Sequence, residues 1–231
     1  MRYNTDMHHI QRKILNLLVY AHSLTYAQLR PKGVESNHFA YHLEQLIKAG
    51  YIKKLERGYE LTPEGLAFAD RASHADMNVR KQAHIVTTMV ITNAKGQTLL
   101  FKHAFQPYLG KVGYPQGRTH FEEDIITSAK RELQEKSGLS TVDVAHRGLA
   151  YITTHKNGEI VSKILSHVFS GTVEDLPDVA SGDELKGSAF WGDLRSYSQD
   201  EYMPGVFRIQ ELLSNTEPEQ LFFDEIHAEL H

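Results

Sequence analysis

Acidic side chains recur at fixed spacing between Gly117 and Leu139. Glu132 and Glu135 stand three residues apart, and position 136 follows directly. If this stretch is a helix, positions 132, 135 and 136 share one face, because side chains three and four residues apart are neighbours on a helix. Carboxylate oxygens on a common face are the kind of ligand that hard divalent cations prefer. The segment therefore indicates a site for metal-assisted chemistry.

The same segment resembles the Nudix box. That pattern is Gly, five residues, Glu, seven residues, then Arg-Glu-U-x-Glu-Glu-x-Gly-U, where U is aliphatic. Eight of the nine fixed positions agree at the correct spacing: Gly117, Glu123, Arg131, Glu132, Leu133, Glu135, Gly138 and Leu139. The resemblance implies a Nudix domain over residues 80–231, with an α/β/α sandwich and a mixed sheet.

For the site, the resemblance implies carboxylates that bind Mg²⁺ or Mn²⁺ beside a substrate diphosphate. Such a metal neutralises phosphate charge and lowers the pKa of a nucleophilic water. The candidate catalytic residues are Glu132, Glu135 and Glu123, and the candidate metal ligands are Gly117, Glu132, Glu135 and Glu184. Glu184 or Asp183 matches the family's later acidic position, or both belong to a surface acidic loop; the two interpretations stay open.

Lys136 departs from the family pattern, which has glutamate at this position. The substitution replaces a −1 ligand by a +1 group and so weakens any Mg²⁺ or Mn²⁺ site. Lys136 stands four residues after Glu132, the favourable order for an ion pair. Alternatively, Lys136 and Arg118 contact the phosphates of a ligand directly. We hypothesise that the domain is a ligand sensor or a weak hydrolase.

The surrounding pattern predicts how this segment is positioned. Asp124 is expected to cap a helix that runs to about Lys136 and ends before Gly138. Alternating β-branched residues predict strands over 84–92, 98–102, 142–154 and 162–173, with a turn at 156–158. A final strand is expected near Phe190, and closing helices are expected over 207–213 and 220–230.

The first part of the chain, residues 1–76, is predicted to form a separate domain. Apolar residues at helical spacing predict helices over 8–20, 25–29 and 36–49, with Thr25 and Ser36 as caps. A hairpin is expected around Arg57-Gly58, and a further helix begins after Thr62 with Pro63 at its first position.

This order resembles a winged helix-turn-helix of bacterial regulators. The resemblance implies that the third helix lies in the DNA major groove and that the hairpin touches phosphates. The candidate DNA contacts are Asn37, His38, Tyr41, Gln45, Lys48, Lys53, Lys54 and Arg57. A protein-docking role is the alternative. His38 and His42 show no set of metal-ligand partners in the sequence and are interpreted as ordinary histidines.

Charge is distributed unevenly between the two parts. The 231 residues carry a net charge of −4, with +2 in residues 1–76 and −6 in residues 77–231. The N-terminal part is therefore the better candidate for meeting a polyanion. The chain has no cysteine, which excludes disulfides and thiolate metal sites, and no apolar run long enough to span a membrane. A cytoplasmic location is expected.

A winged helix joined to a Nudix domain with an altered box resembles a type of bacterial transcriptional regulator. In that type the Nudix domain senses a nucleotide-derived metabolite, although its winged helix follows the Nudix domain. We therefore expect a DNA-binding regulator that reads DNA as a homodimer, with a nucleotide-derived small molecule as ligand and no membrane partner. The alternatives are an active Mg²⁺-dependent pyrophosphohydrolase of nucleoside diphosphate derivatives and an RNA-associated factor.

Overall fold

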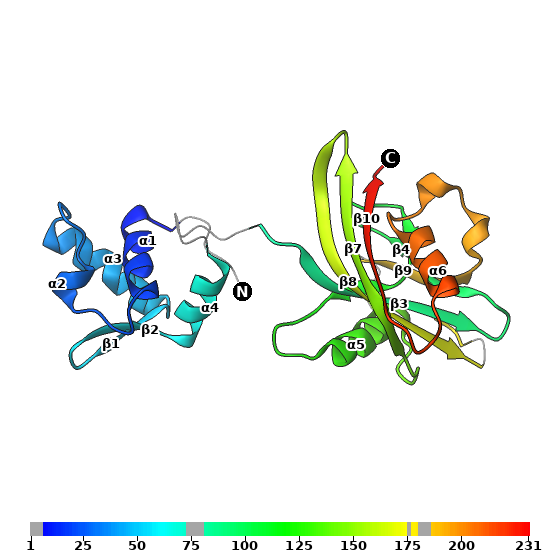
Figure 1. The fold of residues 1–231 in the computed structure, drawn as a ribbon, viewed down its shortest axis with the longest axis horizontal. Helices are drawn as coiled ribbons and strands as arrows, with labels where there is room; N and C mark the ends of the chain where they lie inside the picture. Colours follow the sequence, from blue (N-terminus) through cyan, green and yellow to red (C-terminus); the bar gives the residue numbers. More distant parts are fainter. Residues whose placement is uncertain (1–6, 73–80, 175–176, 180–185) are drawn as a thin grey trace. The chain divides into compact units, whose positions relative to one another are not determined.

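The computed structural model describes residues 7–72, 81–174, 177–179 and 186–231. The chain divides into two compact units, Met1–Lys81 and Gln82–His231 (Figure 1). The predicted linker over residues 71–81 falls largely outside the described residues. Each unit has its own hydrophobic core, so each is described by itself.

The N-terminal unit follows the predicted order of three helices, a hairpin and a helix. Its elements are α1 (His9–Val19), α2 (Tyr26–Leu29), α3 (Ser36–Lys48), β1 (Ile52–Leu55), β2 (Gly58–Leu61) and α4 (Pro63–Arg71). The side chains of Thr25 and Thr62 accept hydrogen bonds from the first turns of α2 and α4. These two helix starts are confirmed, because threonine hydroxyls satisfy backbone donors that have no partner within the helix.

The start of α3 differs from the prediction. Glu35 occupies the N-cap position without a capping hydrogen bond from its side chain, and Ser36 is the first helical residue. The Ser36 hydroxyl lies 3.2 Å from the hydroxyl of Tyr26. The serine side chain is therefore bonded to α2 instead of capping its own helix.

The C-terminal unit is built on a mixed eight-stranded sheet. Its strand order is β10-β7-β8-β3-β4-β5, with β6 beside β3 and β9 beside β4. The β10–β7 and β3–β8 pairs are parallel and the other pairs are antiparallel. The strands are β3 (His84–Asn93), β4 (Thr98–His103), β5 (Val112–Gly113), β6 (Gln116–Arg118), β7 (Ala145–Lys156), β8 (Glu159–Val173), β9 (Gly187–Gly192) and β10 (Phe222–Glu229).

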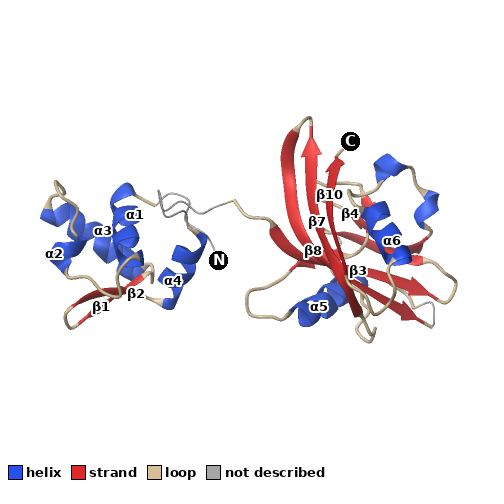
Figure 2. Cartoon of the chain, in the orientation of Figure 1, coloured by secondary structure: helices blue, strands red, loops and turns tan. Residues whose placement is uncertain are grey.

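Helices cover both faces of this sheet (Figure 2). Alternate strand residues point to opposite faces, so Met89 packs with α5 (Ile125–Ser137) whereas Val90 packs with α6 (Val206–Asn215). Two short 3₁₀ helices, η1 (Leu194–Ser196) and η2 (Gln199–Glu201), precede α6. The arrangement is the predicted α/β/α sandwich. None of the described helices is both long and apolar enough to cross a membrane.

The predicted helix over residues 220–230 is wrong, because this segment is strand β10. Phe222, Ile226 and Leu230 are buried and stand four residues apart. That spacing fits one helix face, but it also fits one face of a strand, where every second residue points the same way. Parallel pairing with the long strand β7 settles the choice in favour of the strand.

Substitution of Phe39 tests whether side chains of α3 stabilise the core of the N-terminal unit. The Phe39 side chain is fully buried, whereas Tyr41 on the same helix is 57% exposed. We expect Phe39→Ala to lower the free energy of unfolding of the N-terminal unit by about 3–5 kcal/mol. The matched Tyr41→Ala change is expected to cost no more than about 0.5 kcal/mol. Chemical denaturation followed by circular dichroism measures both, and equal effects would contradict this core.

Candidate functional site

The acidic helix α5 begins and ends where its sequence predicts. The Asp124 side chain accepts a hydrogen bond from the backbone N–H of Thr127, and Gly138 ends the helix with a φ of 77°. A left-handed residue at this position is the usual role of glycine after a helix. The helix therefore presents Arg131, Glu132 and Glu135 in fixed order beside β6.

Arg131 is bonded to three separate parts of the site. Its Nε and Nη2 donate to the Glu123 carboxylate at 2.9 and 2.6 Å, and its Nη1 donates to Glu132 at 2.6 Å. Nη2 also donates to the backbone carbonyl of Arg118 at 3.1 Å. A planar guanidinium offers several donors in fixed directions, so one side chain ties the loop before α5 to the helix.

Glu123 lies inside this network. Both of its oxygens accept hydrogen bonds from Arg131, and one also accepts from the backbone N–H of His120 at 2.7 Å. Mainly because of the Arg131 hydrogen bonds, the pKa of Glu123 falls to about 2. With both oxygens engaged, this carboxylate is arranged to hold Arg131 in place.

Glu132 lies directly against the backbone of Gly117. Its side chain is only 8% exposed, and a Cβ added to residue 117 would lie 1.7 Å from Glu132 Oε2. The absence of a side chain at 117 therefore makes room for the carboxylate. Glu135 is half exposed at the same edge, with its Oε1 3.4 Å from Arg131 Nη1.

This edge fits a hard divalent cation. Mg²⁺ is usually held by one or two carboxylates together with water and substrate phosphates, and Glu132 with Glu135 supplies that number. Arg118, predicted to contact phosphate, has an exposed side chain on β6 beside them. The predicted acidic positions Glu184 and Asp183 lie outside the described residues.

Lys136 occupies the inner side of α5. The residue is 8% exposed, and its Nζ lies 4.9 Å from the centre of the Phe101 ring on β4. This is a cation–π contact in a desolvated setting. The ammonium is therefore built into the interior, one helical turn after the predicted metal ligand Glu132.

His103 on β4 was not predicted from the sequence. It is 5% exposed, and neither of its ring nitrogens has a hydrogen-bond partner among the described residues. Burial first, and the charge of Lys136 second, lower its pKa to about 4. His103 is therefore neutral near pH 7. It stands 33 positions before Lys136 in the sequence (136 − 103), so only folding of the sheet against α5 brings the two side chains close together.

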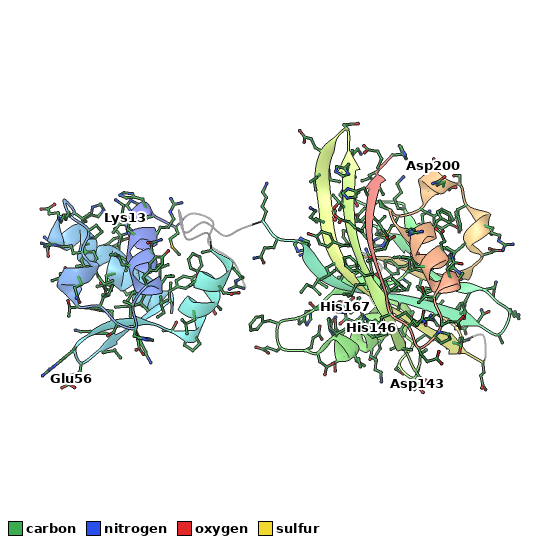
Figure 3. All side chains as sticks on the ribbon, viewed as in Figure 1. Lys13, Glu56, Asp143, His146, His167 and Asp200 are labelled. Carbon is green, nitrogen blue, oxygen red and sulfur yellow. The ribbon has the colours of Figure 1, made fainter. Side chains whose placement is uncertain are left out.

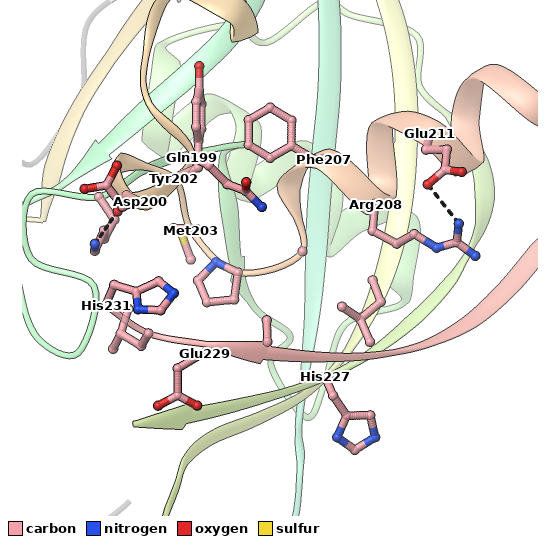
Figure 4. A pocket seen from close by; sticks show the side chains of 16 residues that line it. Gln199, Asp200, Tyr202, Met203, Phe207, Arg208, Glu211, His227, Glu229 and His231 are labelled. Carbon is pink, nitrogen blue, oxygen red and sulfur yellow. Dashed lines mark hydrogen bonds and ion pairs between the residues drawn. The ribbon is translucent and has the colours of Figure 1, made fainter. Parts of the chain in front are cut away.

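A cavity of about 660 Å³ lies elsewhere in the unit, between η2, the start of α6 and the end of β10 (Figure 4). Arg208 in its wall bonds to Glu211 at 2.9 Å and to Asp224 at 2.6 Å. No residue of α5 lines this cavity. We place the chemistry at α5, because the paired carboxylates are there.

The predicted DNA contacts lie on α3 and on the β1–β2 hairpin. Asn37, His38, Tyr41 and Lys48 are exposed, whereas Gln45 is half-buried. Two of the predicted cations are paired, since Lys48 lies 3.2 Å from Glu44 and Lys53 lies 2.7 Å from Glu60. Lys54 and Arg57 are exposed near the hairpin turn, which Glu56 marks in Figure 3.

The family model described as NUDIX domain matches residues 82–209. The fold is similar to the NUDIX domain of Shewanella oneidensis NrtR complexed with ADP ribose, at 15% identity and a TM-score of 0.50 over 66% of this chain and 97% of that one. A MutT protein from Bacillus halodurans shares 21% identity at a TM-score of 0.48, over 62% of this chain and 89% of that one. A MutT protein from Methanosarcina mazei shares 22% sequence identity at a TM-score of 0.47, over 61% of this chain and 100% of that one. No curated protein matches the chain.

The ion pair of Glu123 predicts a pH dependence of stability. Because the folded pKa is near 2 and the ordinary value is 4.5, its stabilisation is complete above pH 4.5 and is lost as pH falls toward 2. The free energy of unfolding of Glu123→Gln should therefore decrease less than that of the wild type as pH falls from 4.5 to about 2. Glu122→Gln, at an exposed neighbouring position, should keep the wild-type fall. Urea titrations at several pH values measure this; identical curves for Glu123→Gln and wild type would disprove the role of the pair.

Proposed function

The chain belongs to the NUDIX domain family, and from that premise we propose that it is a transcriptional regulator whose NUDIX unit binds a nucleoside-diphosphate-linked metabolite with little or no hydrolysis. The N-terminal unit would bind DNA. The observation that carries the proposal is the buried ammonium of Lys136 at the box position where the family has glutamate.

The charge of Lys136 acts differently on metal and on ligand. Two unit charges about 6 Å apart interact by roughly 3 kcal/mol at an effective dielectric constant of about 20, and the interaction doubles for a divalent ion. A lysine in place of glutamate thus removes an attraction for the cation and adds a repulsion. The same ammonium attracts the anionic phosphates of a ligand. The net effect favours binding of the diphosphate over its hydrolysis.

Each remaining box residue has a place in this proposal. Glu132 and Glu135 would hold Mg²⁺ or Mn²⁺ next to the backbone of Gly117, and Arg118 would contact a phosphate. When bound, the metal would neutralise phosphate charge and lower the pKa of a water. Glu123 acts through Arg131 as a positioning residue, since its oxygens are already engaged.

For the N-terminal unit, the exposed residues of α3 and the hairpin support DNA binding. Asn37 and Tyr41 lie on the exposed face of α3, next to one another, where base edges would be read. Lys54 and Arg57 would contact phosphates from the hairpin. Binding as a homodimer would let two copies of α3 read successive turns of the duplex.

An active pyrophosphohydrolase is the second candidate function. The hydrogen bonds of Arg131 to Glu123 and Glu132 favour it, because they keep the carboxylates ordered despite Lys136. The two functions differ in one measurable property, the turnover of a bound diphosphate compound in the presence of Mg²⁺ or Mn²⁺.

Lys136→Glu distinguishes these functions. We expect it to raise Mg²⁺-dependent hydrolysis of ADP ribose, nucleotide sugars or dinucleotides by about tenfold or more, since it restores a carboxylate beside Glu132. Lys130→Glu carries the same charge change at an exposed position of α5 and should leave the rate unchanged. Binding is followed by calorimetry and turnover by phosphate release after phosphatase treatment. Efficient wild-type turnover without any gain in Lys136→Glu would favour the enzyme.

Removing the hairpin cations tests DNA binding. With Lys54→Ala and Arg57→Ala combined, the slope of log affinity against log salt should decrease in magnitude by about 1.8, because two phosphate contacts are lost. Lys13→Ala is the control, since Lys13 on α1 lies at the opposite side of the unit from Glu56 in Figure 3. Fluorescence anisotropy with a labelled duplex measures the slopes. An unchanged slope in the double variant would exclude the hairpin from the interface.

A further inference from the structure

Three histidines from two helices meet in the N-terminal unit. His8 is the N-cap residue of α1, and His38 and His42 stand one turn apart on α3. Each offers a ring nitrogen, and these nitrogens all lie within 4.8 Å of one another. The sequence separates His8 from His38 by thirty residues, so the packing of α1 on α3 creates the cluster.

The contacts within this three-histidine cluster are close. The Nε2 atoms of His38 and His42 are 3.1 Å apart, and the rings of His8 and His42 stack with their centres 4.1 Å apart. His42 is 6% exposed, and its Nδ1 has no hydrogen-bond partner among the described residues. The nitrogen that His42 offers to the cluster is Nε2, so Nδ1 would carry the proton of the metal-binding ring.

One pair in the cluster has the spacing of ligands in a transition-metal site. Metal–nitrogen bonds of about 2.0–2.1 Å in a tetrahedron place the ligand nitrogens about 3.3 Å apart. The His38–His42 pair already has this separation, and histidines four residues apart on one helix are a recurring arrangement for zinc ligands. Burial and the neighbouring histidines lower the pKa of His8 and of His42, which favours the neutral imidazole that binds metal.

We propose that His8, His38 and His42 bind one divalent transition-metal ion, Zn²⁺ or a similar cation, and thereby fasten the start of α1 to α3. Imidazole nitrogens select such ions over Mg²⁺, which prefers oxygen. The site is independent of the carboxylates on α5. It assigns His38 to the metal and leaves the base contacts on α3 to its neighbours Asn37 and Tyr41.

If His8 binds the metal through Nε2, the position of the proton on its ring must change. Its Nδ1 accepts a hydrogen bond from the backbone N–H of Ile10 at 3.3 Å, so the neutral ring carries its proton on Nε2. Coordination through Nε2 moves that proton to Nδ1 and releases the Ile10 bond. The start of α1 is then held by the metal in place of its cap.

Zinc titration of the full chain tests the proposal. The protein is stripped with a chelator and titrated with Zn²⁺ against a chromophoric competitor, in excess Mg²⁺ to occupy the carboxylates. We expect one equivalent to bind, and His38→Gln and His8→Gln each to weaken the affinity about tenfold or more. His38 is exposed, so its substitution leaves the fold intact even if changes at buried His42 do not.

Two control variants make the result specific. His22→Gln removes an exposed histidine of the same unit outside the cluster, and Glu132→Gln removes the carboxylate on α5; both should bind Zn²⁺ as the wild type does. Co²⁺ should give the intense visible absorption of a tetrahedral site in the wild type and lose it in His38→Gln. The proposal is overturned if the wild type binds less than one equivalent, or if His38→Gln and His8→Gln bind as tightly as His22→Gln.

Discussion

The candidate site depends on the hydrogen bonds of one guanidinium. Arg131 links Glu123 in the loop before α5, the carbonyl of Arg118 on β6 and the carboxylate of Glu132 on α5. Without this link the loop and the helix would carry three acidic side chains with no fixed geometry. With it, Glu132 lies against Gly117, with Oε1 bonded to Arg131 and Oε2 nearest to the glycine. The guanidinium contacts the buried carboxylate of Glu132 directly, which lowers the cost of shielding that charge from water.

Lys136 connects this network to the interior of the sheet. Its ammonium lies by the Phe101 ring, and its charge disfavours a proton on His103. A single side chain thus adds its charge to the field at the metal ligands and, after burial, helps to keep the buried His103 neutral. Because the lysine is buried among these partners, it is part of the fold and not a mobile surface charge. This is the physical basis for separating ligand binding from hydrolysis in the proposed function.

Much of the fold could be predicted from local patterns. Thr25, Thr62, Asp124 and Gly138 mark helix ends by chemistry that acts within a few residues, and the box spacing identified the family. The strand β10 could not be predicted, because the spacing of Phe222, Ile226 and Leu230 fits one face of a helix as well as one face of a strand. Only the pairing with β7 decides between the two structures. His103 and the partnership of His8 with His38 and His42 were missed for a similar reason. Their contacts join residues far apart in the chain, and a single sequence carries no signal for such pairs.

Titration with Mn²⁺, followed by the paramagnetic resonance signal of the free ion, tests the central claim most directly. The account predicts that the wild-type chain takes up Mn²⁺ when a nucleoside diphosphate derivative is present and that Glu132→Gln does not. Since Glu132 is the buried carboxylate that Arg131 bonds and that lies against Gly117, its loss should remove the ion even with Glu135 in place. Equal Mn²⁺ binding by the wild type and Glu132→Gln would contradict the account.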